Sequence, residues 1–395
     1  MPSDQRAYRL TAIDMVRGLV IVIMAIDHVR DFVMMAAERD PMTNPNVSLA
    51  LFATRWVTHF CAPVFVLLAG VSAGLMTARR SHGELARYLL TRGLWLILVE
   101  IFIVATSATF ARRIPELGGA LAIPMQVIWA IGASMVVLSA VQAAGRRACL
   151  AVGIAILLGH NLLDPFWPRT DLFDEHWPLW VALHAQMARR AGPFLFAFIY
   201  PLLPWIAVML TGFGLSAVFE QAPAKRNKWL LSGGAVLTAM FIALRMTGVY
   251  GDPNPWQAQP GGAIATVIDF LNTTKYPPSL LFLLMTLGPA AILASQADRV
   301  SGFVKETLVM FGRVPFAFYI AHFFLIHTLA ILIGLAQGFR ASQMVTVFLF
   351  FPKGYGLGLT GVYAVWALVV LILYPFCRWV ASVKARRRDW WLSYL

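Results

Sequence analysis

The chain has 395 residues, of which 59% are hydrophobic and only 13% are charged. Soluble domains carry about 25% charged residues, so this composition excludes an ordinary soluble enzyme. In a soluble protein the formal net charge of +13 would indicate a nucleic-acid partner. Here the basic residues cluster beside long apolar runs, so we predict a lipid bilayer as the surroundings and no nucleic-acid partner.

Apolar runs of about 20 residues, the length that spans a bilayer, recur along the whole chain. Backbone polar groups cannot stay unpaired in lipid, and the runs lack the two-residue alternation of barrel strands, so they must be helices. The sequence therefore predicts one domain over residues 1–395, an all-α polytopic bundle of about ten or eleven spans. The expected spans lie near residues 12–34, 52–77, 88–110, 121–142, 148–163, 196–219, 229–248, 277–295, 308–336 and 358–382.

Loops that alternate along the chain carry most of the Lys and Arg residues, which predicts that those loops and both termini are cytoplasmic. No cleavable signal peptide is expected, because ionisable residues interrupt the first apolar stretch. Two long loops, 164–190 and 248–276, then face outward, and they are either functional or simply solvated. The segment 344–351 is apolar but too short to span, so it lies in the interface or re-enters.

The first expected span carries ionisable side chains on one helical face. Arg17 and His28 are eleven residues apart. That is three turns plus about 20°, so the two share a face, about 16 Å apart along the axis. Asp14 should pair with Arg17 one turn away, and Asp31 or Asp27 could orient the His28 imidazole. A cation near one surface and a base near the other suit two substrates arriving from opposite sides. The alternative is a helix packed by buried ion pairs.

Three other spans carry candidate residues. Arg55 and His59 share a face of the second span, where Pro63 frees a backbone carbonyl near His59. His59 is either a second acid/base or substrate contact, or it occupies the proline-freed backbone. Tyr319 and His322 share a face of the ninth span, for which the alternative is aromatic packing. Near the start of the eighth span, Lys275 could contact a substrate or simply cap the helix.

Several local patterns are set aside. Gly70-Val-Ser-Ala-Gly74 spells a hydrolase elbow, but no strand precedes it, and its glycines predict a close helix-packing face. Residues 356–361 spell a dinucleotide fingerprint but open a span, and no Walker A sequence indicates an ATP-driven pump. His176 lies among acidic residues whose spacing matches no standard site, so no metal is expected. The three cysteines lie in apolar stretches and predict buried thiols.

The run from Arg9 to His28 is similar to the first helix of transmembrane acyltransferases that O-acetylate polysaccharides, including the spacing from Arg17 to His28. Other blocks resemble bacterial members of the heparan-α-glucosaminide N-acetyltransferase catalytic-domain family, namely Thr54–Gly70, Thr274–Ser279, Phe311–Pro315 and Trp390–Leu395. The resemblance covers essentially the whole chain. It implies a multi-span fold that takes acetyl from cytoplasmic acetyl-CoA and passes it to an amine or hydroxyl of a glycan or amino-sugar acceptor on the far side.

The resemblance also implies roles for residues. His28 matches the proposed catalytic histidine, as general base or acyl carrier, with Asp27 or Asp31 orienting it and His59 as the other candidate. The side chains expected at the acetyl-CoA phosphates are those of the cytoplasmic mouth, Arg17, Asp14, Arg92 and Arg313. Those expected at the acceptor are Arg55, Lys275, Tyr276 and His322.

Two other functions fit the sequence. A secondary transporter, or a lipid or glycan flippase, also places ionisable residues at mid-membrane, although the matching halves of many transporters are not seen here. A scaffold or sensor would have mutually paired polar residues and no cavity. The bacterial-like blocks favour the inner (plasma) membrane of a bacterium, and a homodimer is compatible with the sequence.

Overall fold

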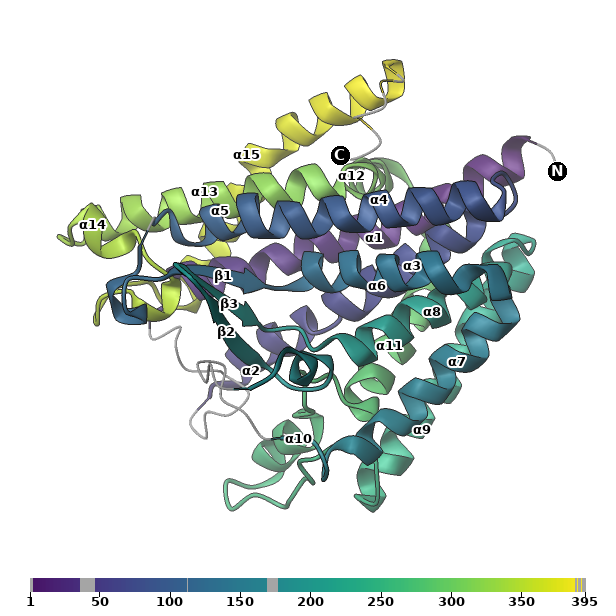
Figure 1. Cartoon of the computed structure of the whole chain (residues 1–395), viewed down its shortest axis with the longest axis horizontal. Helices are drawn as coiled ribbons and strands as arrows, with labels where there is room; N and C mark the ends of the chain where they lie inside the picture. The colour runs from purple at the N-terminus through teal and green to yellow at the C-terminus, as the bar shows by residue number, and fades with distance from the viewer. Residues whose placement is uncertain are drawn as a thin grey trace.

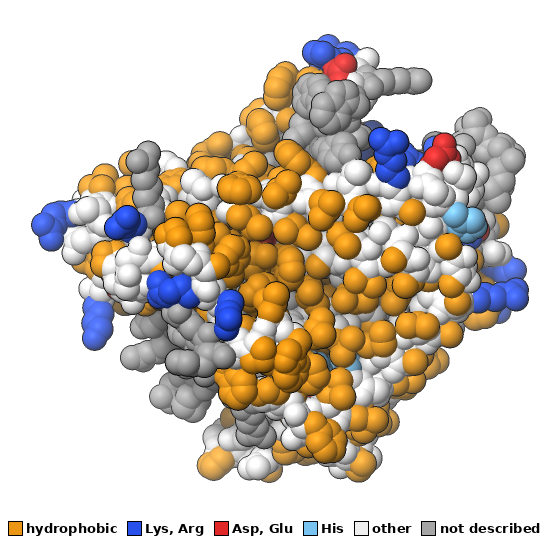
Figure 2. Space-filling model, in the orientation of Figure 1, with side chains coloured by type: hydrophobic (Ala, Val, Ile, Leu, Met, Phe, Trp, Pro, Cys, Tyr) orange, Lys and Arg blue, Asp and Glu red, His pale blue; other side chains and the backbone are white. Residues whose placement is uncertain are grey.

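The computed structural model describes residues 3–35, 47–111, 113–168, 177–387, 389 and 392, with side chains from residue 11 onward. Most of the block from Trp390 to Leu395, and the acidic segment that includes His176, lie outside these described residues. Figure 1 shows long helices laid side by side, with a small sheet near one end of the bundle. Figure 2 shows hydrophobic side chains over most of one face, as expected for a protein surrounded by lipid.

The helices follow the expected order. Their bounds are α1 Ser3–Val33, α2 Leu49–Thr58, α3 Cys61–Met76, α4 His82–Val99, α5 Ala105–Thr109, α6 Val127–Val141, α7 Arg146–Gly159, α8 Leu202–Phe219, α9 Pro223–Thr247, α10 Ala263–Leu271, α11 Leu280–Ser295, α12 Gly302–Arg313, α13 Pro315–Ala336, α14 Ala341–Met344 and α15 Leu359–Arg386. Within the described residues, nine helical segments are long and apolar enough to cross a membrane. This confirms the all-α polytopic class, and α1 adds a long helix in which the charged side chains of Asp27 and Arg30 are buried.

The sequence did not predict the small sheet of β1 Leu121–Met125, β2 Met187–Ala191 and β3 Phe194–Phe198. β3 pairs in parallel with β1 and antiparallel with β2, through a turn at Gly192 whose φ is 58°. The expected spans 121–142 and 196–219 therefore begin several residues too early. A short apolar run reads equally well as a buried strand or as the start of a helix, so periodicity alone could not separate them.

Two expected spans are broken helices. The second span divides at His59, because Pro63 has no N–H to donate to the carbonyl four residues earlier. The ninth divides at Val314, where Pro315 opens α13 at the position in a first helical turn that proline favours. Segment 344–351 continues from α14 into a short 3₁₀ turn, Phe348–Phe350, and packs over one end of α1.

Glycines set the closest helix contacts. An added Cβ on Gly70 would overlap the backbone of Met209 on α8, and one on Gly74 would overlap Ser216. This confirms that the hydrolase-like letters are a helix-packing face. The three cysteines are buried free thiols, as expected.

Candidate active site

A cavity of about 1000 Å³ lies among α1, α3, α4, α6 and α13, at the end of the bundle where α1 begins. We call it the Arg17 cavity. Its polar lining consists of Asp14, Arg17, Ser72, Arg79, Tyr88, Arg92, Glu220, Arg313, Tyr319 and Lys384. This volume lies at the upper end of the range for small-molecule sites, about 300–1000 Å³.

Arg17 is held at the wall of this cavity by three acceptors. Its guanidinium donates to Asp14 Oδ1 at 3.0 Å, to Ser72 Oγ at 3.0 Å and to the Gly312 carbonyl at 3.2 Å. The expected pairing of Asp14 with Arg17 is therefore confirmed. Arg313 lies 3.7 Å from the second oxygen of Asp14, so one carboxylate faces two guanidinium groups. The side of the cavity formed by α1 is consequently rich in positive charge.

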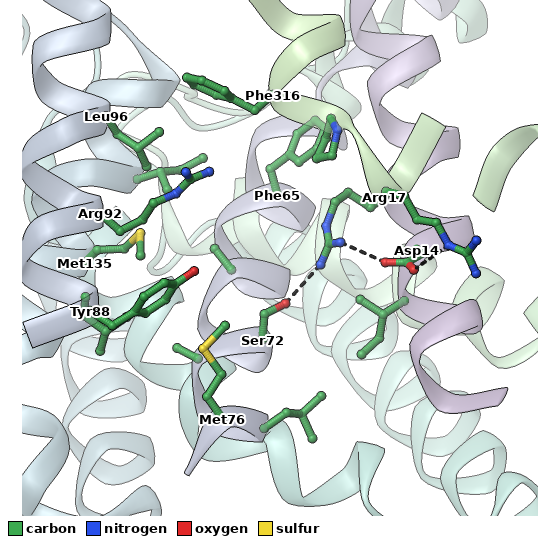
Figure 3. A pocket seen from close by; sticks show the side chains of 18 of the residues that line it. Asp14, Arg17, Phe65, Ser72, Met76, Tyr88, Arg92, Leu96, Met135 and Phe316 are labelled. Atoms are coloured by element: carbon green, nitrogen blue, oxygen red, sulfur yellow. Dashed lines mark hydrogen bonds and ion pairs between the residues drawn. The ribbon is translucent and has the colours of Figure 1, made fainter. Parts of the chain in front are cut away.

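Other cations complete this cavity. Arg92 and Tyr88 of α4 lie across the cavity from Arg17 (Figure 3), and the Arg92 guanidinium lies 5.4 Å from the Phe316 ring centroid. Lys384 of α15 reaches the same cavity and donates to the Arg313 carbonyl at 3.3 Å. Lys384 was not predicted as part of this site. Its position as a basic residue in the last turn of the final span could have indicated it.

A second cavity of about 280 Å³ lies near the other end of α1, and we call it the His28 cavity. It is lined by the small sheet, by the apolar segment 347–350 and by polar side chains from several other parts of the chain. These polar residues are Asp27, His28, Arg30, Asp31, Arg55, Gln126, Tyr200, Lys275 and Tyr276. The structure thus brings Arg55, Lys275 and Tyr276 beside His28, whereas Gln126 and Tyr200 were missed because the sheet that positions them was missed.

The carboxylates near His28 do not orient its ring, contrary to expectation. Asp27 is paired with Arg55 and lies 3.3 Å from Arg30, and Asp31 is 2.6 Å from Arg30. Guanidinium groups satisfy a buried carboxylate better than a neutral imidazole does, because they are charged and offer several donors. The group that is hydrogen-bonded to the His28 ring is His322, with 2.6 Å between His28 Nδ1 and His322 Nε2.

This contact defines the tautomers of the two neutral rings. His322 Nδ1 lies within hydrogen-bond reach of the carbonyls of Tyr319 and Phe318. A carbonyl only accepts, so His322 Nδ1 carries the proton and His322 Nε2 accepts from His28 Nδ1. The remaining nitrogen, His28 Nε2, keeps its lone pair, and no described residue is hydrogen-bonded to it. His28 is thereby left with a basic nitrogen at the wall of the His28 cavity.

His59 lies apart from both cavities. It is 2% exposed, sits at the break between α2 and α3, and packs against the Phe282 ring at 5.3 Å between centroids. Within the described part of the chain its Nδ1 has no hydrogen-bond partner. The geometry therefore favours His59 as a packing residue at the proline break.

The two cavities share a wall of aromatic and imidazole rings. Tyr319 lines the Arg17 cavity, and its ring lies edge-on to His28 at 6.2 Å between centroids. Phe323 lines the His28 cavity and lies 4.4 Å from His28 in the same measure. Two open cavities count against a scaffold of mutually paired polar residues.

A family model described as heparan-alpha-glucosaminide N-acetyltransferase, catalytic, matches residues 9–247. The matched stretch runs from α1 through α9, so it contains Arg17 and His28, while His322 lies beyond it. A search of curated proteins found no match.

Proposed function

Because the chain belongs to the heparan-alpha-glucosaminide N-acetyltransferase catalytic family, we propose that it transfers acetyl from acetyl-CoA to a sugar across the membrane. The family establishes an integral, multi-pass membrane protein of acetyltransferase type. The single observation that carries the finer proposal is the placement of Arg17 and His28. They lie on one helix, in two cavities that share one wall.

The Arg17 cavity suits acetyl-CoA as the donor. The phosphates of CoA require several cations, and arginine binds phosphate with two parallel hydrogen bonds. Arg17, Arg92, Arg313 and Lys384 supply such groups, whereas Asp14 is already engaged by two arginines. The apolar remainder of the cavity, including Met24, would receive the pantetheine arm and the acetyl group.

The His28 cavity suits the acceptor. Its volume is less than a third of that of the Arg17 cavity, which favours one sugar unit, either free or at the end of a glycan. Tyr200, Tyr276 and Phe348 offer apolar surfaces, and Gln126 and Lys275 offer donors for hydroxyl oxygens. An amine or a hydroxyl of the acceptor would lose its proton to His28 Nε2. A route through acetylated His28 uses the same nitrogen and remains the alternative.

The orientation follows from charge. The Arg17 cavity lies at the end where the loops rich in Lys and Arg gather, which supports a cytoplasmic donor site and cytoplasmic termini. The acceptor would then bind from the far side, and a bacterial inner membrane fits this arrangement. A homodimer remains a proposal that these cavities do not require.

A transporter or flippase is the second candidate, because two cavities on either side of one wall also suit alternating access. It predicts no affinity for the thioester donor. Calorimetry of acetyl-CoA with the purified protein in detergent separates the two. We expect micromolar binding that Arg17→Ala weakens at least about tenfold and that His28→Ala leaves largely intact.

Arg147→Ala is the matched control, because Arg147 is an exposed arginine at the same end of the bundle and lines neither cavity. It should leave the dissociation constant unchanged. If neither acetyl-CoA nor CoA binds at millimolar concentration, the transferase proposal fails and the transporter becomes the better function.

A further inference from the structure

The hydroxyl of Tyr319 is a buried polar group to which the proposed function assigns no role. The residue is 3% exposed, and within the described residues its oxygen has no hydrogen-bond partner. Buried hydroxyls are nearly always bonded, so each exception calls for an explanation. Tyr319 as a residue lines the Arg17 cavity, while its hydroxyl oxygen is enclosed just behind that surface, so a small shift of the ring would let a bound molecule supply the missing partner.

Tyr319 lies where that cavity approaches the ring of His28. It is four residues into α13, and its carbonyl accepts from the ring of His322, one turn farther on. Its ring is edge-on to His28, at 6.2 Å between centroids. Arg17, in contrast, is separated from His28 by about 16 Å along α1. A donor whose phosphates lie at Arg17 would therefore extend toward Tyr319 with its thioester.

Resting on the proposed function, we propose that Tyr319 is a catalytic residue whose hydroxyl binds the carbonyl oxygen of the donor thioester. The carbonyl would take the place of the partner that Tyr319 lacks. Among the described residues lining the Arg17 cavity, Tyr319 is the one whose ring contacts both His28 and His322. Tyr319 thus connects the lining of this cavity with the ring of the base.

The acetyl transfer consists of an addition to the thioester carbonyl followed by loss of the thiolate. The acceptor nitrogen or oxygen forms a bond to the carbonyl carbon, and its proton moves to His28 Nε2. The π electrons of the carbonyl move to oxygen, and the Tyr319 hydroxyl stabilises that oxyanion by donating a hydrogen bond. When the carbonyl re-forms, the carbon–sulfur bond breaks, and the departing thiolate takes the proton from His28 as CoA. Tyr319 gives up no proton in this sequence.

The test compares wild type with Tyr319→Phe, which keeps the ring and removes only the hydroxyl. Loss of one oxyanion donor should lower kcat by about 10²–10³-fold. The dissociation constant for CoA, which lacks the carbonyl, should change by less than about threefold. The matched control is Tyr374→Phe on α15, a partly buried tyrosine that lines neither cavity and packs near Phe311. It should leave kcat unchanged.

A spectroscopic measurement tests the bond itself, and its wild-type comparison needs no variant to fold. Acetyl-CoA labelled with ¹³C at the carbonyl should show an infrared band at lower frequency when bound to wild type than when free. Tyr319→Phe should return the band toward its free position, while Tyr374→Phe should keep the shift. An unshifted band in wild type, or an unchanged kcat in Tyr319→Phe, overturns the role of Tyr319 while the transferase stands. Absence of acetyl-CoA binding to wild type overturns the proposed function and this role together.

Discussion

His28 Nδ1 and His322 Nε2 lie 2.6 Å apart, although 294 residues separate them in the chain. This hydrogen bond joins α1 to α13 at the wall between the two cavities. It does for His28 what a carboxylate commonly does for a catalytic histidine, since it keeps the proton on Nδ1 and leaves Nε2 basic. We therefore propose that His322 is a positioning residue rather than a second base.

The first prediction concerns His322→Phe, which keeps an aromatic ring but removes the acceptor. His28 would then populate both tautomers and lose its fixed orientation, so we expect kcat to fall by about 10²-fold or more. Acetyl-CoA affinity should stay close to that of wild type, because His322 does not line the Arg17 cavity. Steady-state acetyl transfer and calorimetry measure the two effects. Unchanged kcat would show that His28 needs no fixed tautomer.

The second prediction separates the two candidate histidines. His28→Asn should abolish transfer, whereas His59→Asn should leave the activity per folded molecule within about threefold of wild type. His59 packs beside Phe282 and lines neither cavity, so its loss should appear as a lower Tm. Activity normalised to the folded fraction from size-exclusion chromatography tests this. The reverse pattern would make His59 the catalytic base.

The arrangement of the ionisable side chains along α1 could be predicted from the sequence, because helical periodicity is a local property. The spacing of Arg17 and His28 placed both on one face, and the Asp14 pair followed from a single turn of helix. The partner of His28 could not be derived in that way, since His322 meets it only through the packing of α1 against α13. Asp27 and Asp31 are nearer to His28 in the sequence, but Asp31 forms an ion pair with Arg30 and Asp27 forms one with Arg55.

The missing sheet has a similar explanation. Strand β1 pairs with β3 through residues more than 70 positions apart, such as Leu121 and Phe194. The hydrophobic pattern of a single sequence does not indicate which distant segments pair. Gln126 and Tyr200 enter the His28 cavity only because those strands pair. The His28 cavity was therefore less predictable than the Arg17 cavity, which is built mainly from helices.

The third prediction tests the closest contact of α1. An added Cβ on Gly312 would overlap the carbonyl of Asp14, so Gly312→Ala must push α12 away from α1. We expect a destabilisation of about 1–3 kcal/mol, together with weaker acetyl-CoA binding because Arg17 donates to the Gly312 carbonyl. Gly83→Ala is the control, since an added Cβ there meets nothing within 4 Å. Thermal melts and calorimetry should show little change for Gly83→Ala, and equal effects of the two substitutions would contradict the close-contact argument.

The last prediction concerns the segment over the His28 cavity. His327 Nε2 lies 2.8 Å from the Met344 carbonyl, and Nδ1 lies 3.0 Å from the Ser107 carbonyl. A neutral ring can donate to one of these carbonyls and a protonated ring to both, so His327 ties α13 to the chain that leads into residues 347–350. His327 also stacks on Phe110 at 4.3 Å between centroids.

His327→Phe should retain the stacking but release this tether, at a cost of about 1–3 kcal/mol for the carbonyl that loses its donor. Because Val347 and Phe350 line the His28 cavity, the freed segment should raise the KM for the acceptor while leaving acetyl-CoA affinity unchanged. Hydrogen exchange of the backbone amides in 341–350 should become faster. Thr328→Val, at an exposed position of the same helix, should alter neither quantity. If exchange in 341–350 is the same in His327→Phe as in wild type, the segment is held by its aromatic packing on Phe32 alone, and His327 is not its tether.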